Sequence, residues 1–374
     1  MMELISLPTT LEELMLENVG LAELPTLHQS KSAPTPSSSS LLSLHISKCH
    51  RLTTLQTGLL GYQSQHQLRA LETLIIEGCG ELVYLPDHGF SALESLKLLH
   101  IEKCTKLRYK PVANCSATLP SSLADLKIID CAALTNDSFF MGLQRLHSLS
   151  SMFIRGVRLG IQEGYSPHNH VLSSLPGELL QHLMTLKQLA MLQCYELENL
   201  GIQSLVSLKE LCIQHCPNLV SCSSSANNNE PLPLEFLQIE RSPIEFINRK
   251  LLGRLTSLRE LQIVGIIIVS FPEEIKDGLH CLKSLKKLHI QGCANLQSLP
   301  DELASIPRLE ELYITECRAV KSLPEMPASL VMLVIDHCLS LSDRCQRGGA
   351  DWNKIENIFF VQVYGVNVKD PANS

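Results

Sequence analysis

The sequence is poor in aromatic residues and in long apolar runs. Aromatic side chains make up 5% of its 374 residues, with a single tryptophan. The longest purely aliphatic run, 266–269, is far shorter than a membrane-spanning helix requires. The N-terminus also lacks the basic start and apolar stretch that direct secretion. We therefore expect a cytoplasmic protein without a membrane span. A nuclear pool is compatible with this expectation.

Several chemical signatures are missing as well. No Gly-Lys dipeptide occurs, so the sequence has no phosphate-binding loop of the Gly-x-x-x-x-Gly-Lys type. It contains neither a Gly-x-Ser-x-Gly nucleophile elbow nor a Cys-x-x-Cys pair. The net charge is −7, and no basic stretch interleaved with aromatics could follow nucleic-acid phosphates. These absences predict a non-enzymatic protein without cofactor or metal, and they argue against nucleic acid as its ligand.

What the sequence has in excess is leucine, with 69 residues, and cysteine, with 14. Most of them belong to one string, Leu-x-x-Leu-x-Ile-x-x-Cys-x-x-Leu, which recurs thirteen times at about 27 residues per step. Four copies have Val19, Val157, Ser242 or Ile266 in place of the cysteine. In the other nine copies this position, the cysteine slot, holds Cys49, Cys79, Cys104, Cys131, Cys194, Cys216, Cys293, Cys317 and Cys338.

The string predicts both a strand and a way of stacking it. Its Leu-x-Ile alternation has the period of a β-strand, with two apolar side chains on one face and the intervening residue on the other. One such strand cannot bury its apolar face alone, so the copies must stack. We expect an α/β leucine-rich-repeat solenoid, a curved horseshoe. Its concave parallel sheet should have about 13 short strands, and its convex side irregular loops and short helices.

The cysteine slot falls where the chain turns after each strand. Cysteine is small, readily buried and a weak hydrogen-bond donor, so it suits a buried turn. A zinc site is the competing interpretation, but ligands one repeat apart point in parallel and do not converge on one ion. Disulfides meet the same objection, because the Cβ atoms of successive repeats do not face each other. We therefore interpret the nine cysteines as a structural ladder.

The repeat also predicts the domain organisation. Residues 1–342 form the predicted array, and residues 343–374 a C-terminal cap or tail. Three stretches depart from the repeat, near residues 30–40, 156–175 and 223–233. Their composition predicts mobile insertions. The first and third stretches are rich in Ser, Pro or Asn and should bury no apolar surface. The cluster at 168–170 (His-Asn-His) in the second stretch could ligate a metal, but a solvated loop is the simpler interpretation.

The chain ends in a recognisable tail. Its residues are Asp343-Arg344-Cys345, Gly349, Asp351-Trp352, Lys354-Ile355 and Ile358. Together with the cysteine-slot repeats and the frequent Leu-Pro turns, this tail resembles the C-terminal region of plant nucleotide-binding leucine-rich-repeat disease-resistance proteins. Asn357 and Phe359 depart from that pattern, because they stand where it often has His and Pro.

The resemblance implies a recognition module of an intracellular immune receptor. Its partner would be a protein: a pathogen effector, a guarded host protein or the receptor's own nucleotide-binding domain. The nucleotide-binding switch itself cannot be carried over, because the phosphate-binding loop is missing. The first repeat begins at Leu11 without a polar cap, so we expect a fragment or a truncated gene product.

Residues that alternate outward on the strands are the candidate partner-binding residues, because the sheet presents them together. All the outward residues together include ten carboxylates and three basic side chains, which favours a basic partner. The ten carboxylates are Glu13, Glu17, Glu77, Glu102, Asp125, Glu210, Glu240, Glu260, Glu311 and Asp336. Solubility explains this excess equally well. Phe153 and Tyr313 are the best single candidates, because an outward aromatic is costly to leave exposed. The candidates are His45, Glu77, His100, Glu102, Lys127, Phe153, Arg155, Glu210, Gln238, Glu240, Glu260, Gln262, Lys287, His289, Glu311 and Tyr313.

Two other classes of protein fit parts of the pattern. Substrate adaptors of F-box ubiquitin ligases also have cysteine-slot repeats, and residues 131–137 are faintly similar to that subclass. The Leu-Pro turns and irregular repeat lengths argue against it. An extracellular receptor arm predicts Asn in the cysteine slot and a secretion signal, and the sequence has neither.

Overall fold

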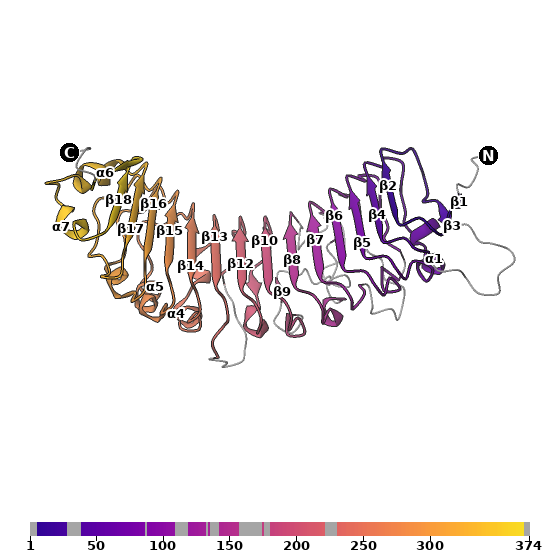
Figure 1. The fold of residues 1–374 in the computed structure, drawn as a ribbon, viewed down its shortest axis with the longest axis horizontal. Helices are drawn as coiled ribbons and strands as arrows, with labels where there is room; N and C mark the ends of the chain where they lie inside the picture. Colours follow the sequence, from indigo (N-terminus) through magenta and orange to yellow (C-terminus); the bar gives the residue numbers. More distant parts are fainter. Residues whose placement is uncertain are drawn as a thin grey trace, which may run out of the picture. The chain divides into compact units, whose positions relative to one another are not determined.

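The computed structural model describes residues 6–27, 39–86, 88–108, 119–131, 134, 142–156, 174–175, 180–220 and 230–369. The chain forms two compact units, Met1–Leu205 (unit 1) and Val206–Ser374 (unit 2). Each unit is a stack of short strands joined by loops and single helical turns (Figure 1). Across the described ranges, no helix reaches the length and apolarity that a membrane crossing needs.

The sheet of unit 1 consists of parallel strands paired in sequence order. Short helical turns fill several of the connections: η1 (Gly58–Leu60), α1 (Tyr62–Gln65), η2 (Gly142–Arg145) and η3 (Ile202–Ser204). Two separate pairs of two-residue strands also form, β1 (Ser6–Leu7) with β3 (Thr26–Leu27) and β9 (Ser174–Leu175) with β11 (Asn199–Leu200). The strands of the sheet are β2 (Glu13–Glu17), β4 (Ser43–Ser47), β5 (Thr73–Glu77), β6 (Leu98–Glu102), β7 (Asp125–Ile129), β8 (Ser151–Arg155) and β10 (Gln188–Leu192).

Unit 2 repeats this arrangement and ends in an antiparallel turn. Its parallel strands are β12 (Glu210–Gln214), β13 (Phe236–Glu240), β14 (Glu260–Val264), β15 (Lys287–Gln291), β16 (Glu311–Thr315), β17 (Met332–Asp336) and β18 (Phe360–Val363). The strand β19 (Val366–Asn367) turns back along β18. The helical turns are η4 (Ile244–Phe246), α4 (Arg249–Leu252), α5 (Glu273–Gly278), η5 (Leu279–Cys281), η6 (Asp301–Ser305), α6 (Leu339–Ser342), η7 (Asp343–Cys345) and α7 (Trp352–Ile355).

The strands pair in the register that the repeat predicts. In unit 2, for example, Leu288 lies opposite Leu312 and Ile290 opposite Ile314. Each of the thirteen predicted repeats contains one five-residue strand, so the predicted solenoid of about 13 strands is confirmed. The strand β18 is one parallel strand more, and it comes from the segment 343–374 that the sequence assigns to a cap. It joins the sheet because Val361 takes the register position opposite Leu333.

The inward leucine and isoleucine side chains form a continuous apolar seam in each unit. Leu44 and Ile46 of β4 are 0% exposed. The corresponding Leu14 and Leu16 of β2 are only half-buried, because β2 has a neighbouring strand of this sheet on one side alone. Stacking between strands therefore buries the seam, as the repeat pattern implies.

All nine predicted ladder cysteines are buried, at 0–1% exposure. Each Sγ donates to the carbonyl two residues earlier, at 3.3–3.6 Å. Several reach the preceding strand as well, as Cys338 does to the carbonyl of Ile314 at 3.4 Å. Ser242 occupies the same slot, and its hydroxyl donates to Glu240 at 2.9 Å and accepts the Cys216 N–H at 3.0 Å. The slot side chain thus ties successive repeats together at the turn.

The turn before the slot has a backbone feature that the sequence does not predict. Every five-residue strand is followed by one residue with a positive φ angle, and Gly occupies only four of the thirteen positions. The other nine include Lys103 and Glu316, whose backbone N–H groups donate to Ile129 and Asp336 of the next strand, both at 2.9 Å. These bonds offset the cost of the left-handed conformation, about 1–2 kcal/mol for a residue with a Cβ atom.

Most residues of the three predicted insertions lie outside the described residues. A few residues at the ends of these insertions are described. Ser174 and Leu175 form β9. Leu232 is 4% exposed, so the expectation that 223–233 buries no apolar surface is wrong at this residue. Its backbone N–H donates to the carbonyl of Arg254 at 2.9 Å, which draws the segment onto the unit just before β13. Ser39, in the first stretch, is buried too.

Candidate recognition surface

The strand face, defined as positions 1, 3 and 5 of the five-residue strands, lies opposite the apolar seam. Burial alternates along the strands, so that in every strand but β2 positions 2 and 4 are buried, and the strand-face positions are mostly half-buried. All sixteen candidate partner-binding residues lie on this face. Glu210 is exposed, and the other fifteen are half-buried. They shield one another because parallel pairing brings side chains of neighbouring strands into contact distance.

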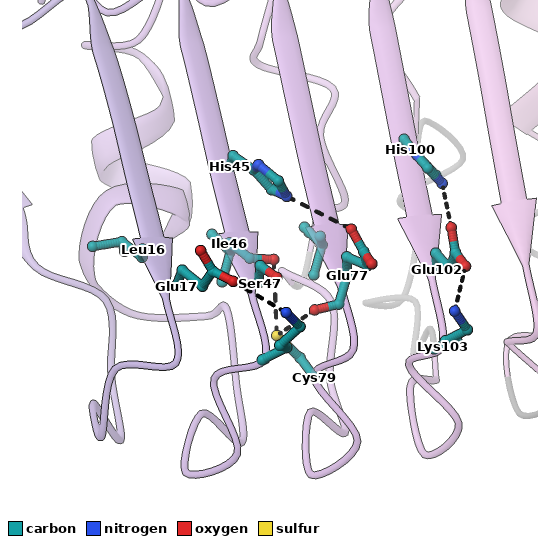
Figure 2. Close-up of polar contacts among 12 residues, drawn as sticks. Leu16, Glu17, His45, Ile46, Ser47, Glu77, Cys79, His100, Glu102 and Lys103 are labelled. Atoms are coloured by element: carbon teal, nitrogen blue, oxygen red, sulfur yellow. Dashed lines mark hydrogen bonds and ion pairs between the residues drawn. The ribbon is translucent and has the colours of Figure 1, made fainter.

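In unit 1, histidines and glutamates from three strands gather on the strand face (Figure 2). Glu77 of β5 lies beside Glu102 of β6. The His45 Nε2 atom is 3.8 Å from a Glu77 carboxylate oxygen, and the His100 Nε2 atom is 3.2 Å from Glu102. Lys103, on the turn after β6, contacts Glu102 at 2.9 Å and holds the pKa of that carboxyl below its usual range. Lys103 thereby holds Glu102 in place, whereas Glu77 lies beside His45 without a hydrogen bond to its ring.

The next strands of unit 1 place the remaining candidates. Lys127 is neighbour to Phe153 across the β7–β8 pair. Its Nζ lies 3.5 Å from Asp125. Arg155 at the end of β8 reaches Asp130 on the preceding turn at 2.7 Å, and this hydrogen bond raises the pKa of the guanidinium. Lys127 and Arg155 each have a carboxylate partner, so neither is a free cation.

In unit 2 a second network spans β14, β15 and β16. The rings of His289 and Tyr313 are stacked, with centroids 4.3 Å apart. Glu311 accepts a hydrogen bond from the Tyr313 hydroxyl at 2.8 Å and contacts Lys287 at 3.0 Å. On the other side, His289 lies 3.5 Å from Glu260. Burial lowers the pKa of His289 more than Glu260 raises it, so the ring stays neutral at neutral pH.

Amide donors extend this network toward the start of unit 2. The Gln262 amide donates to Glu260 at 2.6 Å, and the Gln238 amide to Glu240 at 3.5 Å. Glu240 also lies 3.8 Å from the ring of His215. Glu240, Glu260 and Glu311 each accept a hydrogen bond from a donor two residues away on the same strand, an arrangement that the alternation of side chains permits.

The two aromatic candidates point outward on the strand face, as predicted, but neither ring is fully exposed. Phe153 and Tyr313 are both half-buried on the strand face. Tyr313 is covered on one side by the His289 ring, and its hydroxyl also contacts the Met332 sulfur at 3.5 Å. Side chains on the neighbouring strand thus supply Tyr313 with cover that a single repeat does not reveal.

The strand face offers no evident nucleophile or metal centre in the part of the chain that the structure describes. Burial and the nearby Glu210 raise the pKa of Cys212, so this outward thiol stays protonated. No group of three or more His, Cys, Asp or Glu residues could hold a metal ion among the described residues. The cluster at 168–170, Cys115 and Cys222 all lie outside the described residues.

Two turn residues of unit 1 that the sequence does not identify as part of this surface pair with strand-face side chains. Lys103 and Asp130 follow strands, in the left-handed positions, and they contact Glu102 and Arg155. A signal exists in the sequence, because these residues always stand immediately before the cysteine slot. Without knowledge of the turn geometry, however, their side chains could not be assigned to this surface.

A known structure agrees with the architecture. A leucine-rich-repeat protein of Leptospira interrogans matches over 80% of this chain and 67% of its own, with a TM-score of 0.50 and 21% sequence identity. The fold is a leucine-rich-repeat solenoid. An internalin of Listeria monocytogenes matches this solenoid with a TM-score of 0.40 and 14% identity, over 83% of this chain and 86% of that one. The family described as R13L1/DRL21 LRRs matches residues 247–335 of the solenoid. No curated protein sequence matches the chain.

Proposed function

We propose that the chain is a non-catalytic protein-recognition module that binds its partner through the strand face. The observation that carries the proposal is the preformed network of Lys287, His289, Glu311 and Tyr313, whose members come from adjacent strands of unit 2. Side chains already held in one arrangement lose little conformational freedom on binding. Tyrosine is also among the residue types that dominate binding energy at interfaces.

The charge of the strand face favours a basic partner. In unit 2 the face carries one lysine, Lys287. Opposite charge across an interface speeds encounter and suppresses wrong partners. On the strand face of unit 2 this lysine stands against five carboxylates, Glu210, Glu240, Glu260, Glu311 and Asp336.

We further propose that this module belongs to an intracellular plant immune receptor. The repeat-and-tail resemblance supports that role, and so does the match of residues 247–335 to the R13L1/DRL21 repeats. Its partner would be a pathogen effector, a guarded host protein or the receptor's nucleotide-binding domain. A module that binds the resting and activated states with different affinity would bias the switch between them. None of the twelve described cysteines forms a disulfide, which suits a reducing cytoplasm.

A double substitution on the strand face tests the recognition role. The tagged chain carrying Phe153→Ala and Tyr313→Ala would be assayed by surface plasmon resonance against a panel of effectors, their host targets and receptor nucleotide-binding domains. We expect a partner of the wild-type chain to bind the double variant at least about tenfold more weakly, since interface aromatics typically contribute more than 1 kcal/mol. Ile267→Ala is the matched control, because Ile267 is 85% exposed but follows the turn after β14, away from the strand face.

Unchanged affinity of the double variant would place recognition on another surface. A partner lost equally by the Ile267→Ala control would point to the turn edge of unit 2 instead. The melting temperature of each variant, followed by circular dichroism, separates loss of a contact from loss of folding.

A further inference from the structure

The residues immediately before the strands of unit 2 form a row along one edge of the sheet. Backbone hydrogen bonds of 2.8–2.9 Å join successive members from Lys209 to Val331, for example from the Val331 N–H to the Glu310 carbonyl. The row changes from charged to apolar residues near its C-terminal end. In order from β12 to β18 its members are Lys209, Glu235, Arg259, Lys286, Glu310, Val331 and Phe359.

The first position of each strand changes at the same place. It is charged on β15 and β16, with Lys287 and Glu311, and apolar on β17 and β18, with Met332 and Phe360. Four side chains, Val331, Met332, Phe359 and Phe360, therefore form an apolar block that we call the terminal patch. Phe360 lies opposite Met332, and the Phe360 N–H donates to the Val331 carbonyl at 2.9 Å.

The terminal patch leaves much of its apolar surface in contact with solvent. The Phe359 side chain is 85% exposed and Val331 is 49% exposed, while Met332 and Phe360 are half-buried. Nothing in the packing of the seam requires an aromatic residue at position 359, because Ile358 and Val361 supply the buried contacts there. Contiguous exposed apolar side chains with a polar border are typical of interaction sites.

The border of the terminal patch is acidic on the side facing the array. Glu310 and Glu311 lie on the adjacent strand edge, whereas their partners Lys286 and Lys287 lie one strand farther away, at 2.9 and 3.0 Å from the carboxylates. A ligand seated on the patch would meet the carboxylates before the lysines. The patch also joins the strand face directly, since the Tyr313 hydroxyl contacts Met332.

We propose that the terminal patch is the docking site for a protein segment that carries an aromatic or aliphatic anchor next to Arg or Lys. The anchor would cover Phe359 and Val331, and the basic residue would lie over Glu310 and Glu311. This inference rests on the proposed recognition function and specifies one anchoring point for its partner. Apolar cores with a charged rim are the usual arrangement of an interface hot spot.

Four labelled peptides of twelve residues test the proposal by fluorescence anisotropy with the full 374-residue chain. Three share a central Leu-Trp-Leu anchor and carry Arg, Gln or Glu on both flanks, and the fourth keeps the Arg flanks but replaces the anchor by Ser. We expect the Arg-flanked anchor peptide to bind at least tenfold tighter than the Glu-flanked one, and the Ser peptide to show no measurable binding.

Variants then locate the site. Phe359→Ser should weaken binding of the Arg-flanked anchor peptide at least tenfold. Ile267→Ser, at a residue with the same 85% exposure, should leave this binding unchanged. The double variant Glu310→Gln with Glu311→Gln should reduce the preference for Arg over Glu flanks at least threefold. Equal binding of all four peptides, or wild-type affinity of Phe359→Ser, would overturn the proposal. So would a wild-type dimer in sedimentation that Phe359→Ser converts to monomer, because the occupant would then be a second copy.

The two proposals can fail separately. If Phe153→Ala with Tyr313→Ala loses the protein partner while Phe359→Ser binds every peptide normally, the terminal patch is wrong and the strand face stands. If Phe359→Ser no longer binds the peptides while Phe153→Ala with Tyr313→Ala still binds the protein partner, the terminal patch is supported. The proposal that the strand face binds the partner is then wrong.

Discussion

The rings of His289 and Tyr313 lie parallel, with centroids 4.3 Å apart and planes within 1° of each other. They come from successive repeats, and the β15–β16 register places them side by side. The same tyrosine donates to Glu311. Burial raises the pKa of Glu311, but hydrogen bonds from Lys287 and Tyr313 outweigh it and hold that pKa below its ordinary value. The aromatic stack and the acidic network are therefore one coupled assembly.

Tyr313→Phe should keep the stack and remove one hydrogen bond to Glu311. Losing a donor to the charged form disfavours ionisation, so we expect the pKa of Glu311 to rise toward its ordinary value. The carboxyl chemical shift of Glu311, followed by NMR across an acid titration, measures this change. Tyr84→Phe, at an exposed tyrosine outside the network, should leave the titration unaltered. An unshifted Glu311 in Tyr313→Phe would show that the hydroxyl contributes nothing to the network.

Asp351 should make the C-terminal end of unit 2 sensitive to acid. Its side chain is 1% exposed and lies 2.7 Å from Arg344 and 3.0 Å from Lys354. Burial raises its pKa, but hydrogen bonds from Arg344, Lys354 and the Leu323 N–H leave it below the ordinary value. The carboxylate thus stabilises the fold above the unfolded pKa of about 3.9, and this stabilisation is lost as the pH falls through the lower folded pKa.

Asp351→Asn should accordingly destabilise the chain by about 2 kcal/mol at neutral pH, because it leaves Arg344 and Lys354 without their buried anion. The difference from wild type should shrink below about pH 4. Trp352, the only tryptophan, reports unfolding of this segment by fluorescence in urea. Asp343→Asn, at an exposed position, serves as the control. A penalty that persisted unchanged at low pH would argue for a packing role instead.

At Cys104, the cysteine slot should accept serine and reject leucine. Cys104 is 0% exposed and donates to the Glu102 carbonyl at 3.4 Å. Ser242 makes the equivalent bond in another repeat, so Cys104→Ser should cost less than about 1 kcal/mol. Cys104→Leu adds volume to a closed turn and should cost about 1–3 kcal/mol. Urea unfolding followed by circular dichroism compares the two, and equal stability would mean that the turn is not tightly packed.

Gly292 should be harder to replace than Gly80. It has a φ of +64° with its nearest non-neighbouring heavy atom 3.6 Å from a built Cβ, so the penalty of Gly292→Ala is conformational. We expect about 1 kcal/mol. Gly80→Ala meets no atom within 4 Å and should change the melting temperature little. A Gly292→Ala variant as stable as wild type would contradict the left-handed turn at this repeat.

The apolar seam could be predicted from the sequence because it depends on local spacing. Two apolar positions on each strand and one slot residue repeat thirteen times, and every copy formed its strand. The strand-face positions followed from the same alternation, so all sixteen candidates were placed on the correct side.

Contacts between those side chains could not be predicted in the same way. Whether His289 meets Tyr313, or Lys103 meets Glu102, depends on rotamers and on turn geometry beyond the repeat. The left-handed turns were also invisible, because Lys, Glu and His occupy positions where glycine would have been the signal.

By itself, then, the sequence determined the number of repeats, the inward seam and the identity of the residues on the open face, since each follows from a two-residue period within one strand. Only the tertiary structure decided that Val361 carries the sheet into the tail, that Phe359 stays exposed beside Val331, and which acids and bases meet. These depend on how neighbouring strands stack, and burial by a neighbour is a property that no single repeat contains.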